Sequence, residues 1–236
     1  MSKLYFSIIL LIGLGAWWFR PVPAPAPLPS HSPPLQSFGQ YRFAAFAIND
    51  LKRLQLFSNL EQKLGSAELI KINSCSFLVN AGFYDEQNQH LGWFQVNGRE
   101  LSRRRESRLF DGFLSIVAGR AAIDFSPAPA ADYGVQSGPV LVHQGQPLKL
   151  KLKDDQLRRR IVAAINSDDQ LIFMVILSPQ SDYAGPLLTD LPEVVLAINP
   201  NIVSAINLDG GSASAFIDPE LSLKEYQLLG GYFCYN

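Results

Sequence analysis

Short apolar runs separated by turn-forming residues constrain the fold of this chain more than any other feature. The runs GWFQV and RELSR are joined by Asn97-Gly98, the strongest short-range signal for a β-hairpin. The runs IVAAI and LIFMVI flank a polar turn in the same way. Helices are predicted at only two places, from Ser58 toward Ile72 and over LPEVVLAI, with Pro192 in its first turn. The pattern predicts an α+β fold, a single mixed domain with a largely antiparallel or mixed sheet, in which strands outnumber helices.

The size and charge of the chain limit the number of domains and the class of partner. Its 236 residues, of which 47% are hydrophobic, can bury one sizeable core. The formal net charge is -1, so the composition lacks the basic character that nucleic-acid binding requires. We therefore expect small molecules or neutral polymers as partners, and no nucleic acid.

The N-terminal sequence is typical of a targeting segment followed by a spacer. Lys3 precedes roughly fifteen apolar residues, a length typical of the core of a secretory signal. Residues 1–20 are predicted to be a signal peptide or a membrane anchor, and the proline-rich residues 21–36 an extended linker. Cleavage and retention both stay open. We expect the domain over 37–236 to work outside the cytoplasm, periplasmic or secreted, with the N-terminal segment as its contact with the membrane.

The two cysteines, Cys75 and Cys234, leave two alternatives open. An even count in an oxidising compartment is consistent with a disulfide that ties the C-terminus to the core. Two buried free thiols fit the sequence as well. Neither the spacing of the cysteines nor their neighbours indicate a metal site.

Polar and small residues lie at the ends of three predicted strands. A sheet fixes the backbone at such positions while the loop leaves polar atoms available to a ligand, although the same residue types also form ordinary turns. The three segments are VNAGFYDEQNQH, which contains Asn80, Gly82, Tyr84, Asp85 and His90; SGP at Ser137 and Gly138; and LDGGSAS, which contains Asp209, Gly210, Gly211, Ser212 and Ser214.

These segments resemble, in order and spacing, the motifs of the phosphodiester glycosidase family. VNAGFYD is similar to the N-G-G-F-F-D signature of the family, SGPVLV to its S-G-P block, and AINLDGG to its N-L-D-G-G signature. Between the last two, RIVAAI resembles the R-T-A-I-G block. The resemblance extends from about Phe43 to Phe216, which is nearly the whole predicted domain.

Several positions depart from the family pattern. Tyr84 replaces a phenylalanine and adds a hydroxyl group. Ser212 and Ala213 stand where the family commonly has a third glycine and a serine, so a serine hydroxyl would have to come from Ser212 or Ser214. The arginine of the family motif aligns with Arg160. Because Arg158 and Arg159 precede it directly, the alignment at this position stays open.

The resemblance implies hydrolysis of a sugar linked through its anomeric oxygen to a phosphodiester, or of a related glycosidic bond. Glycosidases use two carboxyl groups, and the matched motifs give Asp209 as the principal catalytic carboxylate and Asp85 as its partner. Arg160 is expected to contact the phosphate through its guanidinium fork. The amides of Gly210, Gly211 and Ser212 are expected to form an anion-binding nest. The other residues expected to contact substrate are Asn80, Gly82, Tyr84, His90, Ser137, Gly138 and Ser214.

Two functions of different classes follow from these expectations. The favoured one is an exported or membrane-tethered glycosidase acting on glycosyl phosphodiesters of envelope or exopolysaccharide material. The alternative is a catalytically silent carbohydrate-binding or polysaccharide-assembly module of the same fold, which the altered DGGS segment favours. No cofactor is predicted, but oxygen-ligand sites have no diagnostic spacing, so the sequence leaves open a calcium or magnesium ion at Asp85 or Asp209. The segment GGSAS lacks the last glycine of a nucleophile elbow, which argues against a serine hydrolase.

Overall fold

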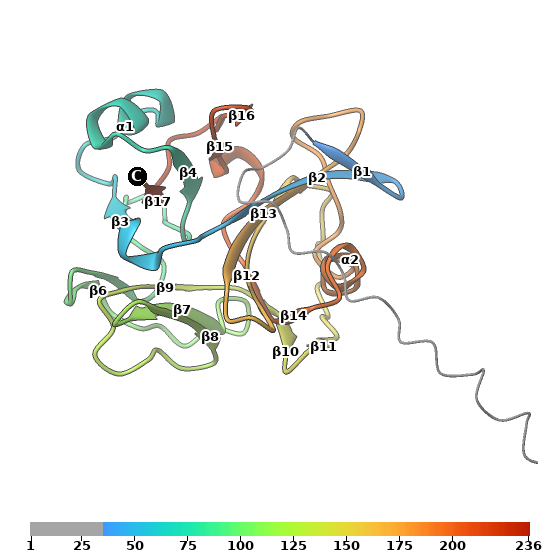
Figure 1. Cartoon of the computed structure of the whole chain (residues 1–236), viewed down its shortest axis with the longest axis horizontal. Coiled ribbons are helices and arrows are strands. Elements are labelled where there is room, and N and C mark those ends of the chain that lie inside the picture. Colours follow the sequence, from blue (N-terminus) through green and yellow to red (C-terminus); the bar gives the residue numbers. More distant parts are fainter. Residues whose placement is uncertain (1–34) are drawn as a thin grey trace, which may run out of the picture.

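Three antiparallel sheets meet around a shared apolar core (Figure 1). The computed structural model describes residues 35–236. The predicted signal or anchor and nearly all of the predicted linker therefore lie outside the described residues. None of the helices within residues 35–236 has the length and apolar character of a membrane span.

A seven-stranded sheet forms the centre of the fold. Its middle strands read as unbroken apolar runs because both of their faces are covered. In β13, for example, Phe173 faces the core shared by the three sheets, while Met174 packs toward α2 (Leu191–Ile198) on the other face. In spatial order the strands are β1 (Gln36–Phe38), β2 (Tyr41–Ala47), β13 (Leu171–Leu177), β12 (Arg160–Asn166), β14 (Ile202–Asn207), β10 (Val140–His143) and β11 (Gln146–Pro147).

A five-stranded sheet contains the C-terminal strand and is covered on its outer face by α1 (Ser66–Asn73). Leu69 of this helix packs with Leu78 and Tyr232 of the sheet. The Cys75–Cys234 disulfide joins the end of the helix to the C-terminal strand, which decides between the two alternatives for the cysteines. In spatial order the strands are β16 (Ser222–Leu223), β15 (Phe216–Ile217), β4 (Phe77–Asn80), β17 (Gly231–Tyr235) and β3 (Leu54–Ser58).

A second five-stranded sheet contains the predicted Asn97-Gly98 hairpin. Asn97 and Gly98 have φ values of 50° and 72°, as a tight two-residue hairpin requires, and the prediction is confirmed. In spatial order the strands are β6 (Arg99–Ser102), β5 (Phe94–Val96), β9 (Tyr133–Ser137), β7 (Gly112–Val117) and β8 (Arg120–Asp124). Two short 3-10 helices, η1 (Leu51–Arg53) and η2 (Gly211–Ala213), complete the elements.

The fold is mostly β, so the α+β expectation holds only in its coarse form. The helix over LPEVVLAI is confirmed, but the helix expected from Ser58 begins later, because Ser58 is the last residue of β3. The Asn59 side chain then holds a turn by accepting from the Leu64 N–H and donating to the Leu64 carbonyl. The helix starts after Gly65, whose N–H donates to the Glu68 carboxylate.

Candidate functional site

Asp209 lies where the chain passes from the seven-stranded sheet to the sheet that contains β4. The Leu208 N–H donates to the Ile161 carbonyl at 2.8 Å, which continues the first sheet. The next N–H, of Asp209, donates to the Ala81 carbonyl at 3.2 Å, just beyond the end of β4. Backbone bonds to two sheets therefore fix the position of the Asp209 side chain.

Asn80 holds this junction from within the protein. Its Nδ2 donates to the Asp209 carbonyl at 2.6 Å, and its Oδ1 accepts from the Ala215 N–H at 2.9 Å. The side chain is 1% exposed, so its polar atoms bind the backbone and not a ligand. Asn80, expected from the sequence to contact substrate, is a positioning residue that ties together both ends of the loop over 209–215.

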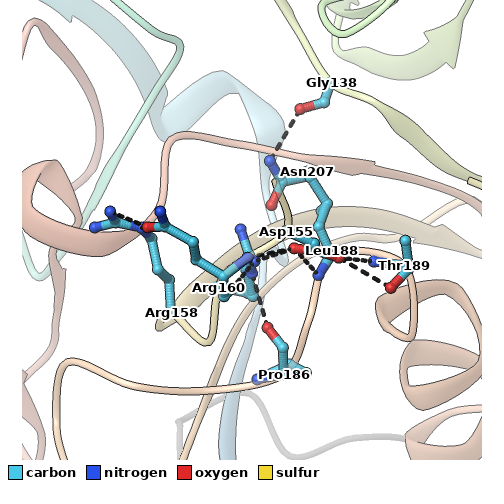
Figure 2. A network of polar contacts seen from close by, with 9 residues as sticks. Gly138, Asp155, Arg158, Arg160, Pro186, Leu188, Thr189 and Asn207 are labelled. Carbon is cyan, nitrogen blue, oxygen red and sulfur yellow. Dashed lines mark hydrogen bonds and ion pairs between the residues drawn. The ribbon is translucent and has the colours of Figure 1, made fainter. Parts of the chain in front are cut away.

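Ser137 and Gly138 hold Asn207, two residues before Asp209, through similar hydrogen bonds. The Asn207 carbonyl accepts from Ser137 Oγ at 2.8 Å and from the Gly138 N–H at 3.0 Å. The Asn207 side chain donates back to the Gly138 carbonyl at 2.9 Å (Figure 2). A Cβ atom at Gly138 would lie 2.5 Å from the Leu109 carbonyl oxygen, so this position requires glycine. The SGP segment is therefore buried support for the end of β14.

A cavity of about 780 Å³ opens in front of this junction. It brings together Asp209 and Asp85, the two carboxylates that the sequence pairs, although they are far apart in the chain. Tyr84, Gly210 and Ser212 also line it, as expected. The remaining lining residues are Phe83, Glu86, Asn88, Ala213, Glu225, Tyr226, Gln227 and Leu228.

The segment over 225–228 is the part of the site that sequence reasoning missed. The N–H groups of Tyr226 and Gln227 donate to the Ser212 carbonyl at 2.7 and 2.9 Å. The Ser212 hydroxyl donates to Gln227 Oε1 at 2.7 Å. These contacts hold the segment beside the loop over 209–215. The sequence of the segment contains no motif that predicts them.

The Asp209 carboxyl group has unusual electrostatics. Burial raises its pKa to about 8, while the Gly210 N–H and the positive charge of Arg158 act in the opposite direction. The group therefore carries a proton at neutral pH. Burial and the Asp209 charge also raise the pKa of Tyr84, whose hydroxyl donates to the Leu228 carbonyl at 2.5 Å. Two neutral hydroxyl-bearing groups thus lie together in the cavity.

Asp85 has a different environment, although it lines the same cavity. Its Oδ1 accepts from the N–H groups of Gln87 at 3.0 Å and Gln89 at 2.9 Å. These are the bonds of a side-chain-supported turn. One oxygen of the Asp85 carboxylate is therefore committed to holding its own loop.

Arg158 is the arginine next to Asp209. Its guanidinium contacts the Tyr183 hydroxyl and Gln156, and its charge acts on the Asp209 carboxyl. A Cβ atom at Gly211, where φ is 69°, would lie 3.1 Å from Arg158 Nη1. Glycine at this position therefore allows the guanidinium to approach the loop closely.

Arg160, which the family motif indicates, is engaged elsewhere (Figure 2). Its guanidinium donates to the carbonyls of Pro186 at 3.0 Å and Gln156 at 2.6 Å and pairs with Asp155 at 3.3 Å. Its side chain is only 8% exposed. The expectation that Arg160 contacts the phosphate is corrected, because desolvation of this charge is offset by fixed partners within the protein.

The predicted anion nest is also mostly occupied by the protein itself. The Gly211 N–H donates to the Arg159 carbonyl at 3.0 Å, and the Gly210 N–H bonds the Asp209 carboxylate. Ser214 is fully buried, donates to the Gly211 carbonyl at 2.7 Å and accepts from Arg159 Nε at 2.8 Å. Of the two serines proposed to replace the family serine, Ser212 lines the cavity and Ser214 does not.

Two further predicted site residues lie outside the cavity lining. His90 stacks on Phe94, with ring centroids 3.7 Å apart, and its Nε2 is hydrogen-bonded to Ser58 Oγ at 2.9 Å. Burial lowers the pKa of His90 to about 4, so proton transfer near neutral pH is not favoured. Gly82 packs against the sheet that contains β9, where a Cβ atom at Gly82 would lie 2.5 Å from Val135 Cγ2. Among residues 35–236, no three His, Cys, Asp or Glu side chains are grouped so as to hold a metal ion.

One family model matches most of the described chain. The family model described as phosphodiester glycosidase matches residues 73–227, a range that contains Asp85, Arg158 and Asp209. None of the curated proteins matches the chain in sequence.

Solved structures share the fold at low sequence identity. The zebrafish N-acetylglucosamine-1-phosphodiester alpha-N-acetylglucosaminidase catalytic domain, auto-inhibited by its pro-peptide, has a TM-score of 0.64 at 14% identity, covering 83% of this chain and 77% of its own. A hypothetical protein from Synechocystis has a TM-score of 0.58 at 14% identity, covering 86% of this chain and 61% of its own. A protein from Burkholderia pseudomallei described as exported has a TM-score of 0.53 at 12% identity, covering 83% of this chain and 73% of its own.

Proposed function

This chain belongs to the phosphodiester glycosidase family, and on that premise we propose that it hydrolyses a glycosyl phosphodiester. Water adds to the anomeric carbon, the bond from that carbon to the phosphate oxygen breaks, and a free sugar and a phosphomonoester leave. The observation that carries the proposal is the Asp209 carboxyl, held by two sheets in the cavity with a pKa of about 8.

The raised pKa of Asp209 suits an anionic substrate. A carboxyl that is neutral near pH 7 does not repel the phosphodiester, whereas an ionised carboxylate at the same position would. The protonated group can also donate its proton to the leaving oxygen, which is the task of the acid in glycosidases. Asp209 therefore serves as the general acid.

Arg158 and Asp85 supply the other roles. The Arg158 guanidinium, beside Asp209, neutralises the phosphate charge by donating hydrogen bonds to its oxygens. Asp85 keeps one oxygen beyond its turn bonds and uses it to orient the attacking water. Because one half of this carboxylate is committed to the loop, Asp85 contributes less than Asp209.

The decisive experiment is turnover of a panel of sugar-1-phosphodiesters by the purified full-length chain. The panel varies the sugar, the anomer and the group beyond the phosphate, and free sugar is measured. Release from at least one substrate, lost in Asp209→Asn, supports the proposal. Saturable binding without release by the wild type would instead identify the chain as the carbohydrate-binding or polysaccharide-assembly module that the altered DGGS segment favours.

We also propose that the domain works outside the cytoplasm on envelope or exopolysaccharide material. The apolar segment at 1–20 favours export, and the Cys75–Cys234 disulfide is the kind of bond that an oxidising compartment maintains. Cell fractionation with detection of the intact chain tests this. An intact chain found free in the cytosol, with both thiols reduced, contradicts it.

A further inference from the structure

The loop between β6 and β7 concentrates positive charge. Four exposed arginines, Arg103, Arg104, Arg105 and Arg108, lie in the loop between β6 and β7. Glu106 is the one acidic residue among 103–110, so four arginines and one glutamate give the loop a formal charge of +3. The only ion pair among residues 35–236 joins Arg160 to Asp155, outside this loop. Like charges this close repel one another, and the formal net charge of the whole chain is only -1.

The backbone of this loop is held firmly by one buried side chain. Gln136 Nε2 donates to the carbonyls of Arg105 at 2.6 Å and Phe110 at 2.7 Å. Its Oε1 accepts from the N–H groups of Arg105 and Trp93, each at 3.0 Å. Both polar atoms of the Gln136 side chain are therefore hydrogen-bonded, and the residue is only 2% exposed. The loop backbone is thus held at Arg105 and at Phe110, which lowers the ordering cost of binding a ligand to this loop.

The end of the same loop contacts one residue that lines the cavity containing Asp209. Phe110, at the end of the loop, packs on Phe83 with ring centroids 4.6 Å apart. Phe83 lines the cavity together with Asp85 and Asp209. A ligand longer than one sugar phosphate that leaves the cavity over Phe83 would therefore meet the end of this loop, two residues from Arg108.

We propose that the arginine loop, residues 103–110, is a subsite for a polyanionic substrate, a polymer whose repeating units carry phosphate groups. This inference rests on the proposed function and names its substrate class. Guanidinium groups donate paired hydrogen bonds to phosphate oxygens, and successive phosphates of such a polymer meet successive arginines. Arg104 lies over the Phe113 ring at 5.2 Å, so Arg103, Arg105 and Arg108 are the principal contacts.

The test compares two triple variants of the full-length chain. Arg103→Gln/Arg105→Gln/Arg108→Gln removes three positive charges from the loop. The matched control, Lys149→Gln/Lys151→Gln/Lys153→Gln, removes three from an exposed segment elsewhere. Each variant is assayed on a monomeric sugar-1-phosphodiester and on a polymer of sugar phosphate units. We expect the ratio of kcat/KM for polymer to that for monomer to fall about tenfold in the arginine variant and to stay constant in the lysine control.

A binding measurement separates this proposal from the proposed function. Linear polyphosphate is the probe, and its affinity is measured against wild type, both triple variants and Asp209→Asn. Weaker binding only in the arginine variant supports the subsite even if no tested substrate is turned over. Equal losses in the two triple variants, or none in either, overturn it. Arginine-dependent binding to vesicles rich in anionic lipid, without binding to polyphosphate, also overturns it in favour of a membrane contact.

Discussion

Asp209 and Asp85 line one cavity, yet the protein uses their carboxyl groups in opposite ways. At Asp209 the backbone bears the structural contacts, through Ala81 and Asn80, and the side chain is left to the cavity. At Asp85 the carboxylate itself bears them, through the N–H groups of Gln87 and Gln89. One oxygen of the Asp85 carboxylate is therefore committed to its own loop.

Arg158 and Arg160 repeat the contrast among the basic residues. The Arg160 guanidinium is buried and bonded to Asp155 and two backbone carbonyls. Arg158 lies close to Gly211, and its charge acts on the Asp209 carboxyl. Arg158 is also hydrogen-bonded, to Gln156 and the Tyr183 hydroxyl, but these partners are side chains, whereas Arg160 is held by an ion pair and two backbone carbonyls. Motif matching alone does not separate these roles, because they depend on where each side chain finds hydrogen-bond partners.

The largest expected effect comes from replacing each aspartate by asparagine in turn. Asp209→Asn should lower kcat roughly 1000-fold, because an amide cannot donate the proton of a general acid in the transition state. Asp85→Asn should lower kcat at most about tenfold, because the amide oxygen still accepts the two turn N–H groups. Free sugar released per enzyme is the measurement, and the circular dichroism of each variant is the control for folding. Equal losses in the two variants would mean that the two carboxylates act as an equivalent pair.

A smaller effect should distinguish the two arginines. Arg158→Gln should raise KM about 10- to 100-fold with little change in stability, since it removes charged hydrogen bonds to the phosphate. Arg160→Gln should instead lower the free energy of unfolding by about 2–4 kcal/mol, because it leaves the largely but not fully buried Asp155 carboxylate without its cation. Substrate kinetics and urea denaturation of both variants provide the comparison. A normal KM in Arg158→Gln together with a raised KM in a stable Arg160→Gln would reverse the assignment.

Much of the fold is accessible from local sequence patterns. Asn97-Gly98 specifies its hairpin because both residues tolerate positive φ, and β13 shows its burial on two faces as an unbroken apolar run. The short strands β15 and β16 are not predicted, because two-residue strands have no periodicity to detect. The position of β15 follows from its long-range pairing with β4, and that of β16 from its pairing with β15.

The site is predictable only in part for the same physical reason. The motif segments indicate Asp209 and Asp85, and the structure brings both to one cavity. The segment over 225–228 belongs to the site through backbone bonds to Ser212, and backbone N–H groups are common to all sequences. His90 has the residue type of a proton-transfer group, but its burial against Phe94 is decided by packing that a single sequence does not show.

The smallest expected effect is on stability. It tests the contrast between Asp209 and Asp85 without any substrate. The folded-state pKa of Asp209 is raised from 3.8 to about 8, so between these values the folded protein holds a proton that the unfolded chain has lost. Stability must therefore fall as pH rises through this window and level off above about 8.

His90 has the opposite sign, because its folded-state pKa is lowered from 6.5 to about 4, and its contribution is lost only as pH falls below 6.5. Between pH 6.5 and pH 8, therefore, only Asp209 and not His90 changes the stability. As the pH rises across this window, the unfolding free energy of the wild type should fall by about 1–2 kcal/mol. Asp209→Asn should remove this slope, and Asp85→Asn should keep it. Urea denaturation across the window measures all three proteins. Parallel curves for wild type and Asp209→Asn would show that Asp209 is ionised in the folded protein, and a general acid at this position would then be ruled out.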